Sequence, residues 1–387
     1  MSNQKRSSVL SAGLALFSMF FGAGDLIWPL ILGGSAGDKN VFAMLGLLIT
    51  GVSLPLVGLL SMMLFQGKYR EFFGRIGKIP GMILILIIQV ILGPIGTIPR
   101  LFALSYATLK PYLPAISLSF FSVLACLVVL AFAIKKRRII DILGFILTPI
   151  LLLSLGAIVV LGLMHLPVQP VSDLTSGAAF TSGLKVGYNT LDLIASFIFA
   201  PLVLSHFCDE GEAEQSPEAR KQIFKKMLKA CLIATALLSA MYVGLTYVAS
   251  YYAHLLPAHL PEERLAAISR YLLGPQGAFI SCIAVAMACL TTAIPVVSIC
   301  AEYIKKDLLK DRCSTLVSLL VTLAISGLIA NLGFTGIANM LSPILQILCP
   351  GLIVLSVLNI ANKMYNVRLA KAPVFTAFAI STIGYLL

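Results

Sequence analysis

Residues 20–29 read Phe-Phe-Gly-Ala-Gly-Asp-Leu-Ile-Trp-Pro and interrupt an apolar stretch with two glycines, a proline and a carboxylate. Glycine costs about 1 kcal/mol in a helix interior, and a carboxylate buried in a membrane costs at least about 2.5 kcal/mol. We therefore predict that the helix over residues 9–32 breaks near Gly22 to Asp25. Such a break exposes carbonyl groups beside amide groups, so it offers a cation site next to an anion site. The alternative is an unbroken helix that packs through its glycines, with Asp25 facing a neighbouring helix.

The composition places this segment in a membrane protein. Of the 387 residues, 59% are hydrophobic and 11% are charged, and the mean hydropathy is +0.99. Soluble domains are about a quarter charged, so a water-soluble enzyme is excluded. A disordered chain is excluded by the apolar content, and a collagen-like fibre by the scarcity of glycine. The eight cysteines occur singly, which gives no metal or disulfide framework. We predict an all-α polytopic membrane protein.

The predicted crossings follow from length, because a helix needs about 20 mainly apolar residues to cross a bilayer. Eleven segments meet this criterion: residues 9–32, 41–65, 81–109, 116–134, 139–163, 184–207, 228–252, 276–304, 313–331, 336–358 and 372 to the end. We divide the chain into a first five-helix repeat (1–163), a second, inverted repeat (164–358) and an extra C-terminal helix (359–387).

The sixth of these segments repeats the design of the first. Residues 187–196 read Gly-Tyr-Asn-Thr-Leu-Asp-Leu-Ile-Ala-Ser, and Pro201 follows, so a glycine, a carboxylate and a proline again lie within one crossing. An offset of five crossings is odd and therefore reverses the orientation. This is the arrangement of an inverted five-plus-five repeat, in which two broken helices mark a binding site at the membrane midplane.

The basic residues indicate the orientation of the chain. Most of the 28 lysines and arginines fall on one side of the predicted crossings, as is typical of cytoplasmic loops, so we place the N-terminus in the cytoplasm. The net charge of +12 is then explained by the orientation of the chain in the membrane and does not indicate a nucleic-acid partner. The first apolar run continues through Trp28 and Pro29 without a signal-peptidase site, which favours a retained first helix.

Two other crossings carry polar groups. The eighth contains Ala288, Thr291 and Thr292, whose adjacent hydroxyls could add hard oxygen ligands for sodium to the carbonyls of the broken first helix. The alternative is that each threonine bonds to its own helix backbone. The third contains Arg100, which could pair with Asp25 or Asp192, face the substrate path as a gating residue, or extend to the outer interface.

These motifs together resemble the bacterial branched-chain amino acid:cation symporters, the LIVCS or BrnQ family within the amino acid–polyamine–cation superfamily. Residues 17–29, FSMFFGAGDLIWP, are similar to that family's F-x-M-F-F-G-A-G-N-L-I-F-P signature, and further matches follow in order at 97–100 (TIPR), 187–195 (GYNTLDLIA) and 289–292 (CLTT). The resemblance covers nearly the whole chain. It implies a carrier that imports leucine, isoleucine and valine with Na⁺ or H⁺, on the LeuT fold with broken first and sixth helices.

The resemblance also implies site residues, carried over by position. For Na⁺ it nominates the carbonyls of Ser18, Phe21 and Ala288 and the hydroxyls of Thr291 and Thr292. The substrate carboxylate would meet the amides of Gly22, Ala23 and Gly24, and the amino group would meet the sixth-helix break at Tyr188, Asn189 and Asp192. Asp25 is also assigned to the substrate site.

The chain departs from the family in two ways. Asp25 stands where the family has asparagine, which implies a second cation, a protonated aspartate or an altered choice of substrate. The family's twelfth helix is absent, but the inferred core lies in the first ten helices, so we expect function to survive.

We therefore expect a secondary active transporter in the bacterial inner membrane, with an amino acid and the lipid bilayer as its partners. We expect no enzymatic activity, no resident cofactor and no nucleic-acid partner, and the sequence does not indicate an oligomeric state. Four alternatives stay open: a carrier for another apolar amino acid such as methionine or phenylalanine, an uncoupled facilitator or channel, a receptor that binds without transport, and a membrane-embedded enzyme built on Asp25 and Asp192.

Overall fold

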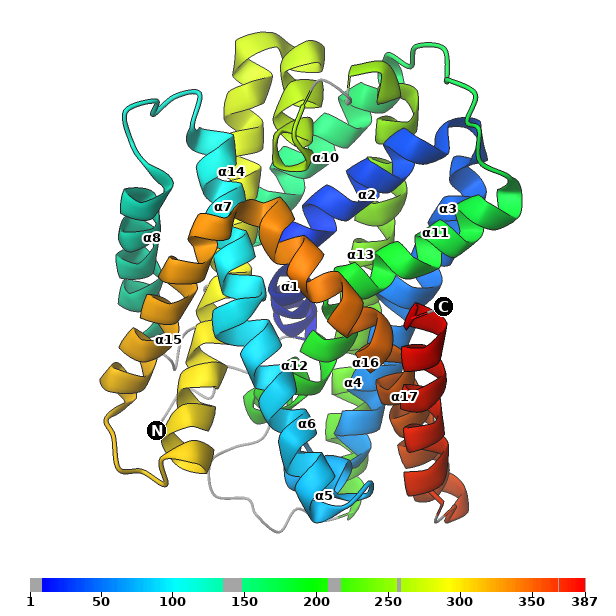
Figure 1. The fold of residues 1–387 in the computed structure, drawn as a ribbon, viewed down its shortest axis with the longest axis vertical. Coiled ribbons are helices and arrows are strands. Elements are labelled where there is room, and N and C mark those ends of the chain that lie inside the picture. Colours follow the sequence, from blue (N-terminus) through cyan, green and yellow to red (C-terminus); the bar gives the residue numbers. More distant parts are fainter. Residues whose placement is uncertain (1–8, 135–147, 208–216, 256–258, 368, 387) are drawn as a thin grey trace.

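The computed structural model describes residues 9–134, 148–207, 217–255, 259–367 and 369–386, and within these ranges the regular structure is entirely helical (Figure 1). The predicted all-α class is therefore confirmed. The basic residues at positions 5, 6, 135–138 and 368 and the start of the predicted fifth crossing lie outside the described residues.

The first crossing is broken at the place that its glycines indicate, near Gly22. Helix α1 covers Val9–Phe20 and α2 covers Ala23–Ala36, so the two halves are separated by Phe21 and Gly22. Gly22 has an extended backbone (φ −114°, ψ −154°), which ends the hydrogen-bond ladder of α1. Asp25 falls in the first turn of α2, where the helix dipole favours a negative charge.

The sixth crossing is broken as well. Helix α11 covers Ser176–Asn189 and α12 covers Asp192–Phe207, with a bend of 41° between them. Leu191 adopts a left-handed backbone (φ 75°), which costs about 1–2 kcal/mol for a residue with a side chain. The Thr190 hydroxyl steadies the break, because it donates to the Gly187 carbonyl (2.9 Å) and accepts from the Asp192 amide (3.4 Å).

The other helices follow the predicted crossings in order. Their bounds are α3 Asn40–Leu48, α4 Leu54–Leu64, α5 Tyr69–Gly74, α6 Lys78–Val90, α7 Thr97–Leu109, α8 Leu118–Ala133, α10 Thr148–Met164, α13 Pro217–Tyr251, α14 Arg264–Tyr303, α15 Thr315–Ile329, α16 Gly333–Tyr365 and α17 Lys371–Leu386. Short π-helical turns lie at Ile49–Ser53, Ile91–Ile95 and Ile304–Leu308, and 3₁₀ turns at Gly37–Lys39, Ala253–Leu255, Pro261–Glu263 and Ala330–Leu332.

Several helices differ from the prediction: α13 starts at Pro217 and not at 228, α11 starts at Ser176 and not at 184, and α16 ends at Tyr365 and not at 358. The third crossing is also interrupted, because Gly93 is non-helical (φ −85°, ψ −108°) beside Pro94, and α7 starts only at Thr97. Helix α14 begins at Arg264, ahead of the predicted start at 276, and is kinked at Gly274 (φ 64°). A polar stretch outside the apolar run is helical there, which hydropathy alone does not reveal.

The apolar surface fits a membrane. Five helical stretches in the described residues are long and apolar enough to cross a bilayer, and the bent pair of α11 and α12 adds a sixth. The count of eleven crossings and the inverted repeat stay predictions. The proposed boundary between 358 and 359 falls inside α16. Large apolar side chains are exposed on the outer helices, among them Phe120, Leu127, Leu153, Leu328 and Ile380.

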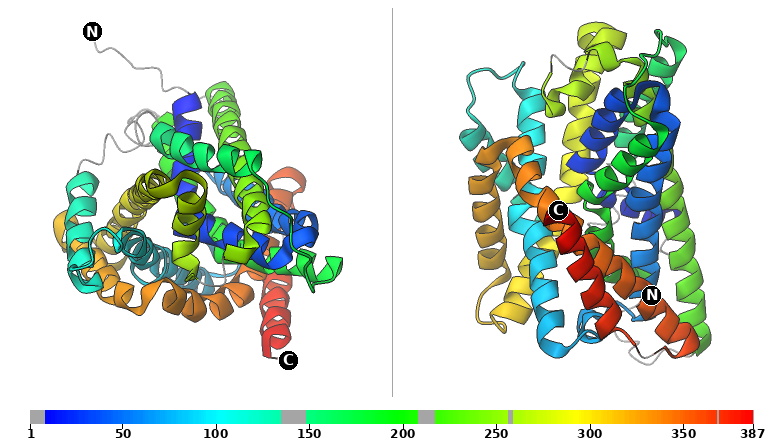
Figure 2. Two further views of the ribbon diagram at one scale, coloured as in Figure 1. Left: turned by 90° about the horizontal axis from the view of Figure 1, so that it is seen from above. Right: turned by 45° about the vertical axis from the view of Figure 1, so that its right-hand side comes forward.

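The breaks of the first and sixth crossings lie inside the bundle, whereas the start of α11 reaches its edge (Figure 1). Helices α1 and α2 both pack on α13, and α11 packs on α3, while α8, α15 and α17 lie toward the outside (Figures 1 and 2). The two breaks therefore occupy the centre of the protein, where side chains are screened from lipid by surrounding helices.

Candidate binding site at the helix breaks

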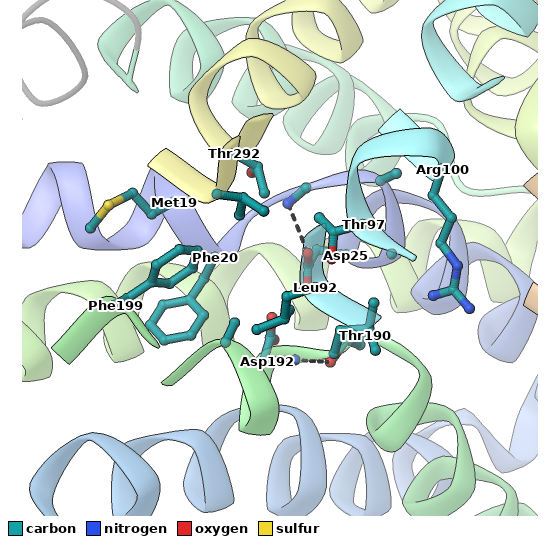
Figure 3. Close-up of a pocket in the computed structure, with 16 residues that line it drawn as sticks. Met19, Phe20, Asp25, Leu92, Thr97, Arg100, Thr190, Asp192, Phe199 and Thr292 are labelled. Atoms are coloured by element: carbon teal, nitrogen blue, oxygen red, sulfur yellow. Dashed lines mark hydrogen bonds between the residues drawn. The ribbon is translucent and has the colours of Figure 1, made fainter. Parts of the chain in front are cut away.

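Both breaks face one cavity. It is lined by residues from α1, α2, α12, α14 and the third crossing, and it holds about 370 Å³ of space between atoms when its open mouth is included (Figure 3). Five residues predicted for the substrate line it: Gly22, Ala23, Gly24, Asp25 and Asp192. The predicted residues Tyr188 and Asn189 are not among the lining residues, because both belong to α11 before the break.

The two breaks touch each other through Gly24. A Cβ atom built on Gly24 would lie 3.0 Å from the Thr190 carbonyl oxygen and 3.1 Å from the Thr190 Cα. These are backbone atoms, which cannot turn aside. A side chain at position 24 would therefore push the first turn of α2 away from the break between α11 and α12.

Asp25 occupies the amide end of its own half-helix. Its Oδ2 atom accepts a hydrogen bond from the Gly22 amide at 2.8 Å, and the side chain is 1% exposed. The sequence assigns this amide to a substrate carboxylate. In the structure the carboxylate of Asp25 holds that position instead, because it reaches back from the third residue of α2 to the amide of the N-cap residue Gly22, as in a capping box.

A tyrosine joins the two buried carboxylates. The Tyr242 hydroxyl, on α13, is hydrogen-bonded to Oδ1 of Asp25 and to Oδ2 of Asp192, the latter at 2.8 Å. Tyr242 is fully buried and Asp192 is 1% exposed. A phenol has one proton to donate, so it can satisfy only one of the two carboxylates as a donor. The other contact requires a further proton or cation.

The threonines of α14 have different partners. The Thr292 hydroxyl donates across helices to the Ser18 carbonyl of α1 at 3.2 Å, whereas the Thr291 hydroxyl donates to the Ala288 carbonyl of its own helix at 3.0 Å. Thr292 lies against the first break, since a Cβ on Gly22 would be 3.1 Å from its hydroxyl oxygen. Four of the five predicted sodium ligands, Ser18, Phe21, Ala288 and Thr291, are fully buried, and Thr292 is 3% exposed.

Arg100 is buried beside the cavity and does not reach the interface. It is 1% exposed and donates from Nη1 to the Asn189 carbonyl at 3.0 Å. The predicted extension to the outer interface is therefore wrong. The predicted pairing with Asp25 or Asp192 is also wrong, because no carboxylate of the described chain lies within ion-pair distance of Arg100. Arg100 does line the cavity, so a role as a gating residue that faces the substrate path stays a prediction.

Several residues of the cavity were not anticipated. Tyr242 completes the polar cluster, Thr97 and Thr190 lie beside it, and Phe20 packs edge-on against Phe199 at 5.3 Å between ring centroids. A tyrosine in the middle of a long membrane helix, away from the interface where tyrosine is enriched, is the one signal that could have indicated Tyr242.

Comparison with known proteins gives a consistent result. A family model described as "branched-chain amino acid transport protein" matches residues 5–386. The chain is 31% identical to the branched-chain amino acid permease BrnQ of Bacillus subtilis, with 97% of this chain and 86% of that protein covered. It is 31% identical to the permease BraB of the same organism, over 92% and 80% of the two chains.

Solved structures share the fold at low identity. A nucleobase-cation-symport-1 family transporter superposes with a TM-score of 0.66 at 13% identity, over 97% of this chain and 91% of that one. A mutant manganese transporter of Eremococcus coleocola superposes with a TM-score of 0.63 at 12% identity, over 100% and 88% of the two chains.

Proposed function

This chain belongs to the branched-chain amino acid transport protein family, and we propose that it is a symporter that imports leucine, isoleucine and valine together with a cation, Na⁺ or H⁺. It is a multi-pass membrane protein whose substrate is a small molecule, an amino acid. We place it in the bacterial inner membrane with a cytoplasmic N-terminus, without a resident cofactor and without an enzymatic step. The motion that we infer is a rocking of the first, second, sixth and seventh helices against the rest of the bundle.

The observation that carries cation coupling is the contact of one hydroxyl with two carboxylates. Asp25 and Asp192 share the Tyr242 hydroxyl, which supplies a single proton. With both carboxylates and Arg100 ionised, the cavity would have a net charge of −1, and an amino acid zwitterion would not change it. One bound Na⁺ or H⁺ would neutralise the site, so the cation stabilises the substrate-ready state and couples its own gradient to uptake.

Two positions are available for the cation. A proton would reside on Asp25 or Asp192. Sodium would lie where the Ser18 carbonyl and the Thr292 hydroxyl approach each other to 3.2 Å, with the remaining predicted ligands nearby. Both positions are buried, so a cation that enters either one would be shielded from water and strongly held by neighbouring oxygens.

The side of the cavity away from Arg100 is apolar. Met19, Phe20 and Phe199 line it, as Figure 3 shows, and their surfaces suit a branched aliphatic side chain. One methylene is worth only about 1–3 kcal/mol in such a pocket, so methionine and phenylalanine are the competitors to test.

The proposal is tested by uptake of labelled leucine into vesicles that contain the purified protein. An inward Na⁺ gradient, an inward H⁺ gradient and no gradient are imposed in parallel, with protein-free vesicles as the control. We expect accumulation above equilibrium with one of the two gradients, and competition by isoleucine and valine stronger than by methionine or phenylalanine.

The outcomes separate the alternatives. Accumulation driven by Na⁺ supports the site at Ser18 and Thr292, and accumulation driven only by H⁺ assigns coupling to Asp25 or Asp192. Leucine that equilibrates without accumulating under either gradient would overturn symport in favour of a facilitator. Binding without any flux or counterflow would favour a receptor.

A further inference from the structure

Arg100 is a buried cation that forms no ion pair with any residue that the structure describes. Its guanidinium carbon lies 5.7 Å from the centre of the Phe334 ring, and one nitrogen, Nη1, bonds to the Asn189 carbonyl. The Nε and Nη2 atoms have no hydrogen-bond partner within the part of the chain that the structure describes. A guanidinium removed from water is strongly destabilising unless a carboxylate or similar anion compensates it. No carboxylate among the described residues compensates this charge.

The neighbouring carboxylates do not supply that anion. Asp25 is held by the Gly22 amide and the Tyr242 hydroxyl, and Asp192 by the same hydroxyl. Neither forms an ion pair with Arg100 among the described residues. The edge of Arg100 formed by Nε and Nη2 thus has no partner among the described residues, and Arg100 lines the cavity in which we propose that the amino acid binds.

The usual alternative for a substrate carboxylate, the amide end of a broken helix, is partly occupied by the chain itself. The amide end of a broken helix is an anion site, but here the chain's own Asp25 accepts from the Gly22 amide at 2.8 Å. A second carboxylate at that place would meet the negative charge of Asp25. The carboxylate of an incoming zwitterion is therefore driven toward the guanidinium.

From these contacts we propose that Arg100 binds the carboxylate of the amino acid substrate, with the amino group facing Asp25 and Asp192. This inference rests on the proposed function and adds the residue that recognises the substrate's carboxylate. In Figure 3 the two acidic residues lie between Arg100 on one side and Met19, Phe20 and Phe199 on the other. An L-amino acid would thus be held at three points: carboxylate at Arg100, amino group at the acidic pair and side chain on the apolar wall.

The geometry of the guanidinium suits this role. Its planar fork can present two N–H groups to one carboxylate, which an ammonium group cannot do. The cation–π contact with Phe334 and the bond to Asn189 hold the fork in place before the substrate arrives, so little conformational freedom is lost on binding.

The test compares leucine with leucinol, in which a hydroxymethyl group replaces the carboxylate. Binding to the purified full chain is measured by ligand-induced thermal stabilisation, which does not require transport. We expect the native protein to bind leucine roughly 10- to 100-fold more tightly than leucinol. In Arg100→Gln the affinity for leucine should fall by a similar factor, while the affinity for leucinol should change by less than about threefold. The preference for leucine over leucinol should therefore disappear.

Two further variants keep the test decisive. Arg100→Lys keeps the charge but loses the fork, and should retain only part of the preference. Arg70→Gln removes an exposed arginine on α5 and should leave the preference unchanged. If Arg100→Gln does not fold, Arg100→Lys with an undiminished preference would overturn the inference, as would an equal affinity of the native protein for leucine and leucinol.

The two proposals fail in different ways. Discrimination by Arg100 with no gradient-driven uptake would contradict symport and leave the role of Arg100 standing. Gradient-driven uptake with full carboxylate discrimination in Arg100→Gln would contradict the role of Arg100 and leave symport standing.

Discussion

Thr291 and Thr292 are adjacent in the sequence, but their hydroxyls have different partners. Thr292 reaches the Ser18 carbonyl of α1, while Thr291 bonds to Ala288 within α14. Only the first of these bonds joins two helices, and it lies at the place that we propose for sodium. The two residues are therefore expected to differ in their effect on sodium coupling.

The substitution Thr292→Val removes the hydroxyl and keeps the shape of the side chain. We expect it to raise the Na⁺ concentration needed for half-maximal leucine uptake by about tenfold or more, because one oxygen ligand is lost. Thr291→Val is the matched control on the same helix and should have a smaller effect. The double change Thr291→Ala, Thr292→Ala should abolish sodium stimulation, and an unaltered sodium dependence in the double variant would contradict the site.

The two carboxylates of the site can be predicted from the sequence, whereas the tyrosine that is hydrogen-bonded to both of them cannot. Asp25 and Asp192 stand out because each interrupts an apolar run, where a charge is costly. Tyr242 has no such mark, because its contact depends on how α13 packs on α2 and α12. Arg100 is conspicuous for the same reason as the carboxylates. That no described carboxylate forms an ion pair with Arg100 follows only from the packing of the helices.

At the level of elements, α11 is held against α3 by glycines. A Cβ built on Gly183 would lie 2.0 Å from the Ala43 carbonyl oxygen, and one on Gly46 would lie 2.2 Å from the Phe180 carbonyl oxygen. The two backbones are therefore in direct contact. Because α11 leads into the break at Thr190 and Leu191, this contact positions one side of the cavity.

Gly183→Ala should force α11 away from α3. We expect a loss of about 1–3 kcal/mol in the free energy of unfolding, as for overpacked interfaces, and reduced leucine uptake because the break moves with α11. Gly177→Ala, on the same helix but with no atom within 4 Å of the added Cβ, should change stability by no more than about 1 kcal/mol. Thermal unfolding of the two purified variants makes the comparison, and equal midpoints would argue against the tight contact.

The breaks of the first and sixth crossings could be predicted because glycine, proline and aspartate each disfavour an apolar helix for a separate reason. The break of the third crossing has the same local cause, Gly93 and Pro94, but Pro94 alone is compatible with a kinked helix. The early start of α14 depends on Pro261–Glu263 folding into a 3₁₀ turn that leads directly into the helix. Hydropathy carries no information about such a start.

At the scale of the whole molecule, α5 and Arg75, the residue that follows it, connect two distant parts of the bundle, α12 and the end of α16. Phe72 and Phe73 pack on Phe197 of α12 with ring centroids 5.4 and 5.6 Å away. Arg75 donates to the Leu358 carbonyl (2.9 Å), the Asn359 side-chain oxygen (2.9 Å) and the Val367 carbonyl (3.0 Å) at the end of α16. If the sixth helix rocks against the tenth, these bonds have to open.

Arg75→Gln should therefore loosen α5. A hydrogen bond to a charged group is worth about 1.5–3 kcal/mol, and 1.4 kcal/mol corresponds to a factor of ten, so we expect amide hydrogen exchange in α5 to accelerate about tenfold or more. Arg70 is the matched control on the same segment: its ion pair with Asp307 is exposed, with side chains 78% and 38% accessible, and such pairs contribute about 0–1 kcal/mol. Arg70→Gln should thus change exchange in α5 only slightly. Exchange measured by mass spectrometry on the purified chains decides between them, and unchanged protection in Arg75→Gln would mean that the bonds from Arg75 to α16 do not hold α5 in place.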